Sequence, residues 1–118
     1  RIVHTQTPTV TAALLANAAV SGIIGTNIFN DEPPDEAVYP CLTYEESLTP
    51  VGLADNEEYA YASEWNMEAY QRGSAWALAD AVEVVMKSLG YVCGFKNSAG
   101  MVGVVHQVSM KFTMIKEV

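Results

Sequence analysis

The sequence predicts an α+β domain: an antiparallel or mixed sheet of about four to five strands, with two helices packed on one face. Two observations predict it. The elements follow the order helix, three strands, helix, two strands, and loops of hairpin length join the strands within each run. The strands also alternate apolar with polar residues, a period typical of a sheet with one packed face. The 118 residues, 50% of them hydrophobic, suffice for one domain with one core, residues 1–118.

The first helix is expected from Pro8 to Ser21. Thr7 is a candidate cap for the free N–H groups, and Pro8 at the first helical position sacrifices no hydrogen bond. Apolar residues recur within the segment at helical spacing. Gly22 is expected to end the helix in the left-handed conformation.

Three strands are expected next, over Thr26 to Asn30, Cys41 to Leu48 and Glu57 to Tyr70. Proline, glycine, aspartate and asparagine in Thr49 to Asn56 indicate a loop between the last two strands. The third strand has the clearest period of two. Its expected apolar face is Tyr59, Tyr61, Trp65, Met67 and Ala69, with Ser63 as an exception.

The second helix is expected from Ala75 to Leu89, where apolar residues form a continuous stripe. Ser74 is a candidate cap at its start, and Gly90 is expected to terminate it. The remaining elements are a strand over Tyr91 to Phe95, a turn over Lys96 to Gly100 and a final strand over Gly103 to Ile115.

The charge of the chain is unevenly distributed. Residues 1–71 contain one basic and eleven acidic residues, a net charge of −10, whereas residues 72–118 contain five basic and three acidic residues, a net charge of +2. A chain with a total charge of −8 gains no affinity by neutralising phosphates, which argues against a sequence-reading DNA- or RNA-binding protein. Its apolar stretches fall short of the ~20 residues of a membrane span, and no membrane association is expected.

No catalytic, cofactor-binding or metal-binding residues are expected, and the chain is predicted not to be an enzyme. There is no strand–turn–helix nucleophile motif, and His106 lies among apolar strand residues as a core or interface histidine would. Cys41 and Cys93 have neither metal-ligand nor redox spacing, so free thiols are expected. The segment Asp31–Glu36 lacks the spaced oxygen ligands and the glycine of a calcium loop.

Three features are candidates for contacts with partners. Two acidic segments between strands are candidate docking or lumen-facing loops: Asp31, Glu32, Pro33, Pro34, Asp35 and Glu36 in the first, and Asp55, Glu57 and Glu58 within a predicted loop from Leu48 to Glu58. The third is Trp76, expected on the polar side of the second helix beside Asp80 and Glu83. These three residues are a candidate subunit interface, since exposed tryptophan is enriched at interfaces. Packing of Trp76 over the helix edge onto the sheet is an equally good interpretation.

One arrangement of segments extends over most of residues 9–116. It consists of an N-terminal helix, Gly25–Phe29, an acidic proline-containing loop, Tyr39–Tyr44, Ser63–Tyr70, a helix within Ala79–Tyr91 and a long final strand. This layout resembles the tail-completion or tail-terminator proteins of long-tailed phages and prophages.

The resemblance implies a structural virion protein that needs no cofactor and is assembled in the host cytoplasm. It implies a closed, usually hexameric ring at the head-proximal end of the tail, which terminates the tail tube and joins it to the head connector. The partners would be other copies of the chain, the tail tube protein and the connector or stopper protein. DNA would pass through the lumen without specific binding, because an acidic lumen repels phosphate.

Two alternatives remain open. The first is a different assembly protein, either a head-side adaptor or stopper or a subunit of the tail tube. The second, from another class, is a small ligand-binding or enzymatic α+β domain.

Overall fold

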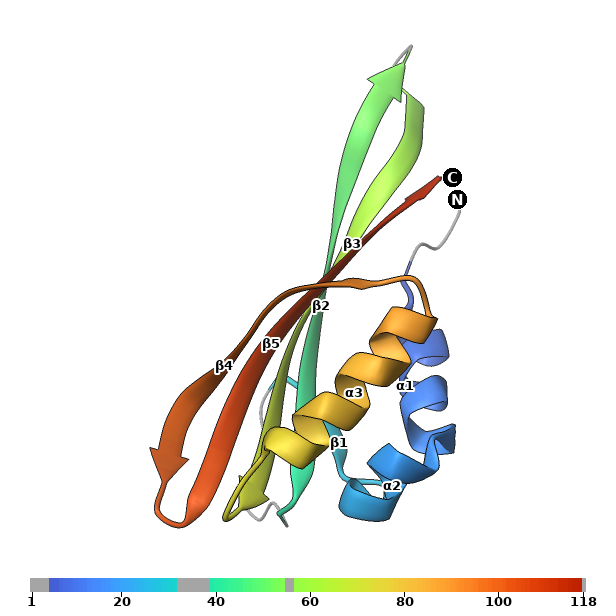
Figure 1. Cartoon of the computed structure of the whole chain (residues 1–118). Coiled ribbons are helices and arrows are strands. Elements are labelled where there is room, and N and C mark those ends of the chain that lie inside the picture. Colours follow the sequence, from blue (N-terminus) through green and yellow to red (C-terminus); the bar gives the residue numbers. More distant parts are fainter. Residues whose placement is uncertain (1–4, 32–38, 55–56, 118) are drawn as a thin grey trace.

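The computed structural model describes residues 5–31, 39–54 and 57–117. In this part of the chain three helices and a five-stranded sheet are present (Figure 1). They are α1 (Thr7–Ala16), α2 (Ala18–Ile24), β1 (Ile28–Asn30), β2 (Cys41–Ala54), β3 (Glu57–Arg72), α3 (Trp76–Ser88), β4 (Val92–Val102) and β5 (Val105–Glu117). The strand order is β1-β2-β3-β5-β4, with β1 parallel to β2 and all other pairs antiparallel. The predicted α+β class is confirmed.

The N-terminal segment forms two helices instead of the single helix that was predicted. Asn17 is extended, with ψ at 121°, and α1 and α2 are bent by 85° across it. The Asn17 side chain accepts hydrogen bonds from the backbone N–H groups of Ala19, at 3.0 Å, and Val20, at 3.2 Å, so it caps α2. The predicted stop at Gly22 is wrong, because α2 continues to Ile24 and is ended by Gly25, which has a φ of 61°.

The start of α1 is capped from the sheet. Thr7 is the first helical residue and not the predicted cap. Instead the Glu46 carboxylate, on β2, accepts hydrogen bonds from the backbone N–H of Gln6, at 2.8 Å, and from Thr7 Oγ1, at 3.0 Å. A carboxylate is stabilised there by the unpaired N–H groups and the positive end of the helix dipole.

The predicted loop from Leu48 to Glu58 is wrong for most of its length. β2 continues to Ala54 and β3 begins at Glu57, so the two strands form a long hairpin that projects beyond the helices (Figure 1). Pro50 is accommodated because the outer side of β2 is an edge here. Leu42 N–H donates to Asn27 O on that outer side, and by strand alternation the missing N–H of Pro50 would also point outward.

The predicted turn over Lys96 to Gly100 is also strand. β4 runs to Val102, and the turn to β5 lies at residues 103–104. The pairing of β4 with β5 shifts between Cys93 and Phe95 and again between Ser98 and Gly100. Each bulge adds a residue to β4, which disrupts the period of two by which a strand is identified.

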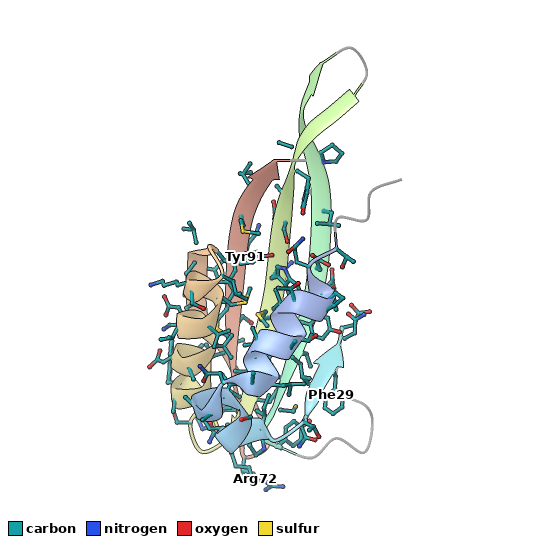
Figure 2. All side chains as sticks on the ribbon, turned by 90° about the vertical axis from the view of Figure 1, so that its right-hand side faces the viewer. Phe29, Arg72 and Tyr91 are labelled. Carbon is teal, nitrogen blue, oxygen red and sulfur yellow. The ribbon has the colours of Figure 1, made fainter. Side chains whose placement is uncertain are left out.

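Helices α1, α2 and α3 pack on one face of the sheet and bury one core (Figures 1 and 2). The predicted apolar face of β3 is confirmed where burial is described. Fully buried side chains come from β3 and β5 (Trp65, Met67, Met110, Phe112) and from the helices (Val10, Leu14, Leu78, Val82, Met86). Gly90 ends α3 as predicted, with φ at 98° and with Tyr91 N–H donating to Met86 O, at 3.0 Å.

Ser63, the polar exception on the packed face of β3, is buried and hydrogen-bonded. Its hydroxyl lies 2.8 Å from the Tyr91 hydroxyl, and Trp65 Nε1 donates to both oxygens, at 3.2 and 3.1 Å. This network attaches the loop after α3 to the centre of the sheet, and it satisfies polar groups that would otherwise be costly to bury.

Candidate assembly surfaces

The face of the sheet opposite the three helices is polar along its three central strands. We call it the bare face. Paired residues of β2, β3 and β5 lie side by side and so form rows across this face. Its members on β2, β3 and β5 include Glu45, Ser47, Thr49, Glu64, Asn66, Glu68, Gln107, Ser109, Lys111 and Thr113.

Polar contacts connect several of these side chains. Lys111 Nζ lies 3.4 Å from Glu64 Oε2, and Glu68 Oε2 accepts from both Gln107 Nε2 and the Tyr70 hydroxyl. The bare face therefore has the composition of a surface that contacts water or polar partners and not of a second hydrophobic core.

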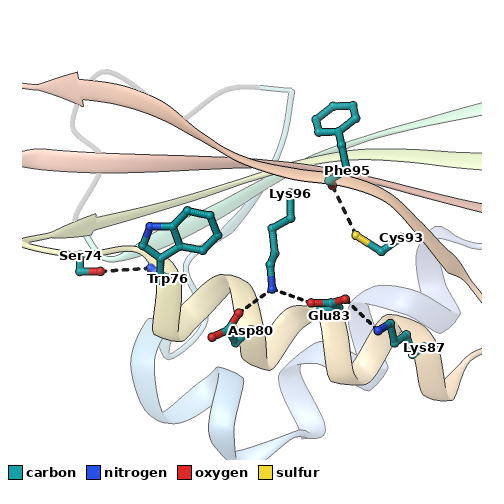
Figure 3. Close-up of polar contacts among 8 residues, drawn as sticks. All are labelled: Ser74, Trp76, Asp80, Glu83, Lys87, Cys93, Phe95 and Lys96. Carbon is teal, nitrogen blue, oxygen red and sulfur yellow. Dashed lines mark hydrogen bonds and ion pairs between the residues drawn. The ribbon is translucent and has the colours of Figure 1, made fainter.

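A second surface lies where α3 meets β4 (Figure 3). Lys96 Nζ, on β4, lies 2.6 Å from Asp80 Oδ1 and 2.6 Å from Glu83 Oε1, both on α3. Lys87 Nζ lies 2.9 Å from Glu83 Oε2. The hydrogen bonds from Lys96 and Lys87 lower the pKa of Glu83, and those to Asp80 and Glu83 raise the pKa of Lys96. We call these residues, together with Trp76, the Lys96 cluster.

Trp76 lies at the edge of α3 and stays partly exposed. The side chain is 41% exposed, and its ring lies at the helix edge facing β4, with Lys96 Nζ 5.9 Å from the ring centroid. The three predicted interface residues, Trp76, Asp80 and Glu83, thus lie together around Lys96. Sequence reasoning missed Lys96 because it lay in a predicted turn. The contacts seen are within the chain, and a role at a subunit interface stays a prediction.

The described residues of the two acidic segments lie at different places along β2. Asp31, with φ at 70°, follows β1, and its N–H donates to Tyr44 O, at 2.8 Å. The backbones of Glu57 and Glu58 pair with Ala54 and Leu53 at the tip of the hairpin. Ten residues of β2 separate the two places, which corresponds to roughly 33 Å. Glu32, Pro33, Pro34, Asp35, Glu36 and Asp55 lie outside the described residues.

Cys41 and Cys93 are free thiols, as expected. Burial raises the pKa of Cys41 to about 11 and is also the main cause of the raised pKa of Cys93. Both thiols are therefore protonated and weakly nucleophilic at neutral pH. His106 is half-buried on β5, opposite Gln71.

Within the described ranges, no three histidine, cysteine or acidic side chains are grouped as metal ligands. No single described helix is long and apolar enough to cross a membrane. Helices α1 and α2 reach that length and hydropathy only when taken together, and they are sharply bent. Their apolar residues Val10, Leu14, Val20 and Ile24 are buried in the core of the domain.

Comparison with known proteins identifies the class to which this fold belongs. A chain of the solved structure described as "Virion of native gene transfer agent (GTA) particle" is similar in fold, with a TM-score of 0.68, 13% sequence identity and coverage of 92% of each chain. No curated protein matches the chain. The family model described as "Tail completion protein gp17" matches residues 8–99. The protein is thus a structural component of a phage tail.

More specifically, the chain belongs to the tail completion protein gp17 family. This membership confirms the resemblance noted from the sequence. It also places the chain in a family of structural phage tail proteins.

Proposed function

We propose that the protein forms a closed ring at the head-proximal end of the phage tail, where it terminates the tail tube and joins it to the head connector. One observation carries the proposal beyond family membership: the sheet has all described helices on one face and a polar, partly acidic face on the other. Such a subunit has distinct inner and outer sides, as the wall of a ring requires. The hexameric ring order is the expectation from the family resemblance.

In this ring the bare face lines the lumen and the helices lie outside. Glu45, Glu64 and Glu68 are carried on the bare face, and one of them, Glu64, is paired with Lys111. Repeated in every copy, these carboxylates repel the phosphates of DNA. The polymer then passes without binding, which is the reverse of a basic nucleic-acid groove.

The β2–β3 hairpin and the segment after β1 are the proposed docking elements. The hairpin projects along the long axis of the molecule (Figure 1), which measures 53 Å against 26 and 25 Å for the other two. A projecting hairpin at one end reaches a neighbouring ring, either the tail tube or the head connector. Asp31, where the acidic segment begins, is bonded near the start of β2, and we propose that this segment contacts a different partner.

The proposal is tested by assembling phage particles in the absence of the protein. Without it, we expect filled heads and separate tails, with tubes of uncontrolled length. A label on the protein in complete particles is expected only at the junction between head and tail. Label along the whole tube would instead indicate a tube subunit, and label on isolated heads would indicate an adaptor or stopper.

Charge reversal tests the first acidic segment. Replacing Asp31, Glu32, Asp35 and Glu36 by lysine is expected to leave the melting temperature within a few degrees and to reduce head–tail joining, counted as joined particles by electron microscopy. Replacement of Glu57 and Glu58 by lysine is the matching charge reversal at the tip of the hairpin. Normal joining in the first variant would exclude that segment as a docking element.

A further inference from the structure

Among the described residues the sheet has two open edges, and a head-to-tail ring needs two different contact surfaces. We propose that the ring closes by strand pairing, in which the outer edge of β4 in one copy joins the outer edge of β2 in the next. This inference rests on the proposed ring. It names the surfaces that form it, and the partner is a second copy of the chain.

The open part of the β2 edge begins where β1 ends. β1 pairs only with Leu42–Tyr44, and Tyr44 O accepts the last bond on that side, from Asp31 N–H. Beyond this point no described strand lies outside β2. Because Leu42 N–H points outward, alternation turns the N–H and C=O groups of Glu46 and Leu48 outward as well. Pro50 has no N–H to offer, so the segment that can pair is residues 45–49.

The β4 edge has a regular segment of similar length. β5 is the only described strand that pairs with β4, and the two bulges enclose residues 95–98. Lysines often guard edge strands against unwanted pairing. Here Lys96 is directed towards α3 and bound to Asp80 and Glu83, which leaves the edge unguarded (Figure 3). Phe95, 42% exposed beside this edge, would be partly covered by an added strand.

The strand directions favour this pairing. β5 runs parallel to β2, because each is antiparallel to β3, and β4 runs opposite to both. Rotation about a ring axis along the strands leaves their directions unchanged. The β4 edge of one copy therefore meets the β2 edge of the next in antiparallel orientation. A two-fold contact would instead join β4 to β4.

The charges of the two sides of the sheet differ. The segment with a net charge of −10, residues 1–71, contributes α1, α2, β1, β2 and nearly all of β3, whereas residues 72–118, with a net charge of +2, contribute α3, β4 and β5. The asymmetry along the sequence thus becomes an asymmetry between the two sides of the sheet. β2 carries Glu45 and Glu46 and no basic residue. The charged residues of α3 and β4 are two acidic and two basic, so this side carries no net charge. Head-to-tail contact therefore avoids the repulsion between like charges that β2–β2 contact would bring.

Disulfide crosslinking tests the proposal. Ser47 on β2 and Asn97 on β4 are exposed, lie in the two pairing segments and belong to the bare-face side of the sheet. A chain carrying both Ser47→Cys and Asn97→Cys is expected to give, on mild oxidation, a ladder of covalent multimers that ends at the ring order. Ser47→Cys with Phe95→Cys tests the neighbouring register. Each experiment is run on purified protein at high concentration and on assembled particles.

The single variants and the unchanged chain are the controls. In each single variant the introduced cysteine faces the unchanged residue of the neighbouring copy, so head-to-tail contact predicts no multimers. Crosslinking of Asn97→Cys alone would overturn the proposal in favour of β4–β4 contact. A ring that forms but crosslinks in neither register would overturn the edge pairing and leave the ring standing. Absence of a ring from both purified protein and particles would overturn the proposed function itself.

A charge change provides an independent test. Glu45→Lys places a positive charge on the β2 edge, and Asn66→Lys places one directly opposite it on β3, on the same face but one strand inward. We expect Glu45→Lys to shift the midpoint of ring assembly to at least several-fold higher concentration, and Asn66→Lys to shift it much less. Equal effects of the two variants would contradict an edge contact.

Discussion

Lys96 shows how one side chain attaches an edge strand to the body of the molecule. It joins β4 to two carboxylates of α3, and it and Glu83 are only 21% and 20% exposed, so water screens their attraction incompletely. Edge strands lack a second neighbouring strand, and their ends separate from a sheet readily. The Lys96 cluster therefore sets the position of the β4 edge relative to the helix.

Lys96→Met keeps the aliphatic stem and removes the charge. We expect a loss of about 1 kcal/mol in the free energy of unfolding, because a half-buried ion pair with two carboxylates is lost. Lys111→Met is the matched control, since its pair with Glu64 is longer, at 3.4 Å, and more exposed. It is expected to cost less than about 0.5 kcal/mol. Chemical denaturation of both variants measures the difference, and equal losses would contradict a special role for Lys96.

The lowered pKa of Glu83 predicts how stability depends on pH. A carboxyl group whose folded-state pKa lies below its unfolded value of 4.5 stabilises the fold above that pH. The contribution is lost as the pH falls through the folded-state pKa. In Glu83→Gln, stability at pH 7 should be lower and should fall less steeply below pH 4.5. Melting temperatures from pH 3 to 7 check this, and parallel curves for the two proteins would refute it.

The residues that sequence reasoning found and missed differ in the range of their contacts. The alternation on β3 identified Trp65, Met67 and Ala69 as buried, because burial on a regular strand follows from the spacing of its residues. The bond from Glu46 to the start of α1 links residues 40 apart in sequence, and no local pattern encodes it. Lys96 was missed because two bulges interrupt the alternation around it.

At the scale of elements, the sequence predicted the order of helices and strands but not their ends. Thr49 to Asn56 has loop composition, yet most of it is strand, since an edge tolerates Pro50 and the long partner strand supplies the pairing. The N-terminal helix was predicted as one because its apolar spacing continues past Asn17. The cap formed by the Asn17 side chain, which starts a new helix, determines the break.

The end of α2 provides a matched pair of glycine substitutions. Gly25, at φ 61°, requires a conformation that alanine adopts only with strain, whereas Gly22 lies inside the helix with nothing within 4 Å of an added Cβ. We expect Gly25→Ala to destabilise by about 1 kcal/mol and Gly22→Ala to be neutral or stabilising by up to about 1 kcal/mol. Thermal denaturation measures both. The opposite order would mean that the helix ends at Gly22.

At the scale of the whole molecule, the charge composition and the strand order together determine how charge is distributed over the sheet. The uneven charge of the sequence becomes a difference between two sides of one sheet, because strands close in sequence are also neighbours in space. The class of fold and the tail-completion family were predictable from the sequence, because both follow from the order of the helices and strands and from the spacing of the apolar residues. The open edges were not, because they depend on which strands lie outermost.

The ring is the claim on which the lumen, the docking elements and the strand-edge contacts all depend. Its most direct test is the mass of the purified protein at high concentration, measured by light scattering and followed by negative-stain imaging. We predict a single multimeric mass, a small whole-number multiple of the 12.8 kDa subunit, and round particles with a central opening. A mass of one subunit at all concentrations, with no rings in images of the protein or of assembled tails, would contradict it.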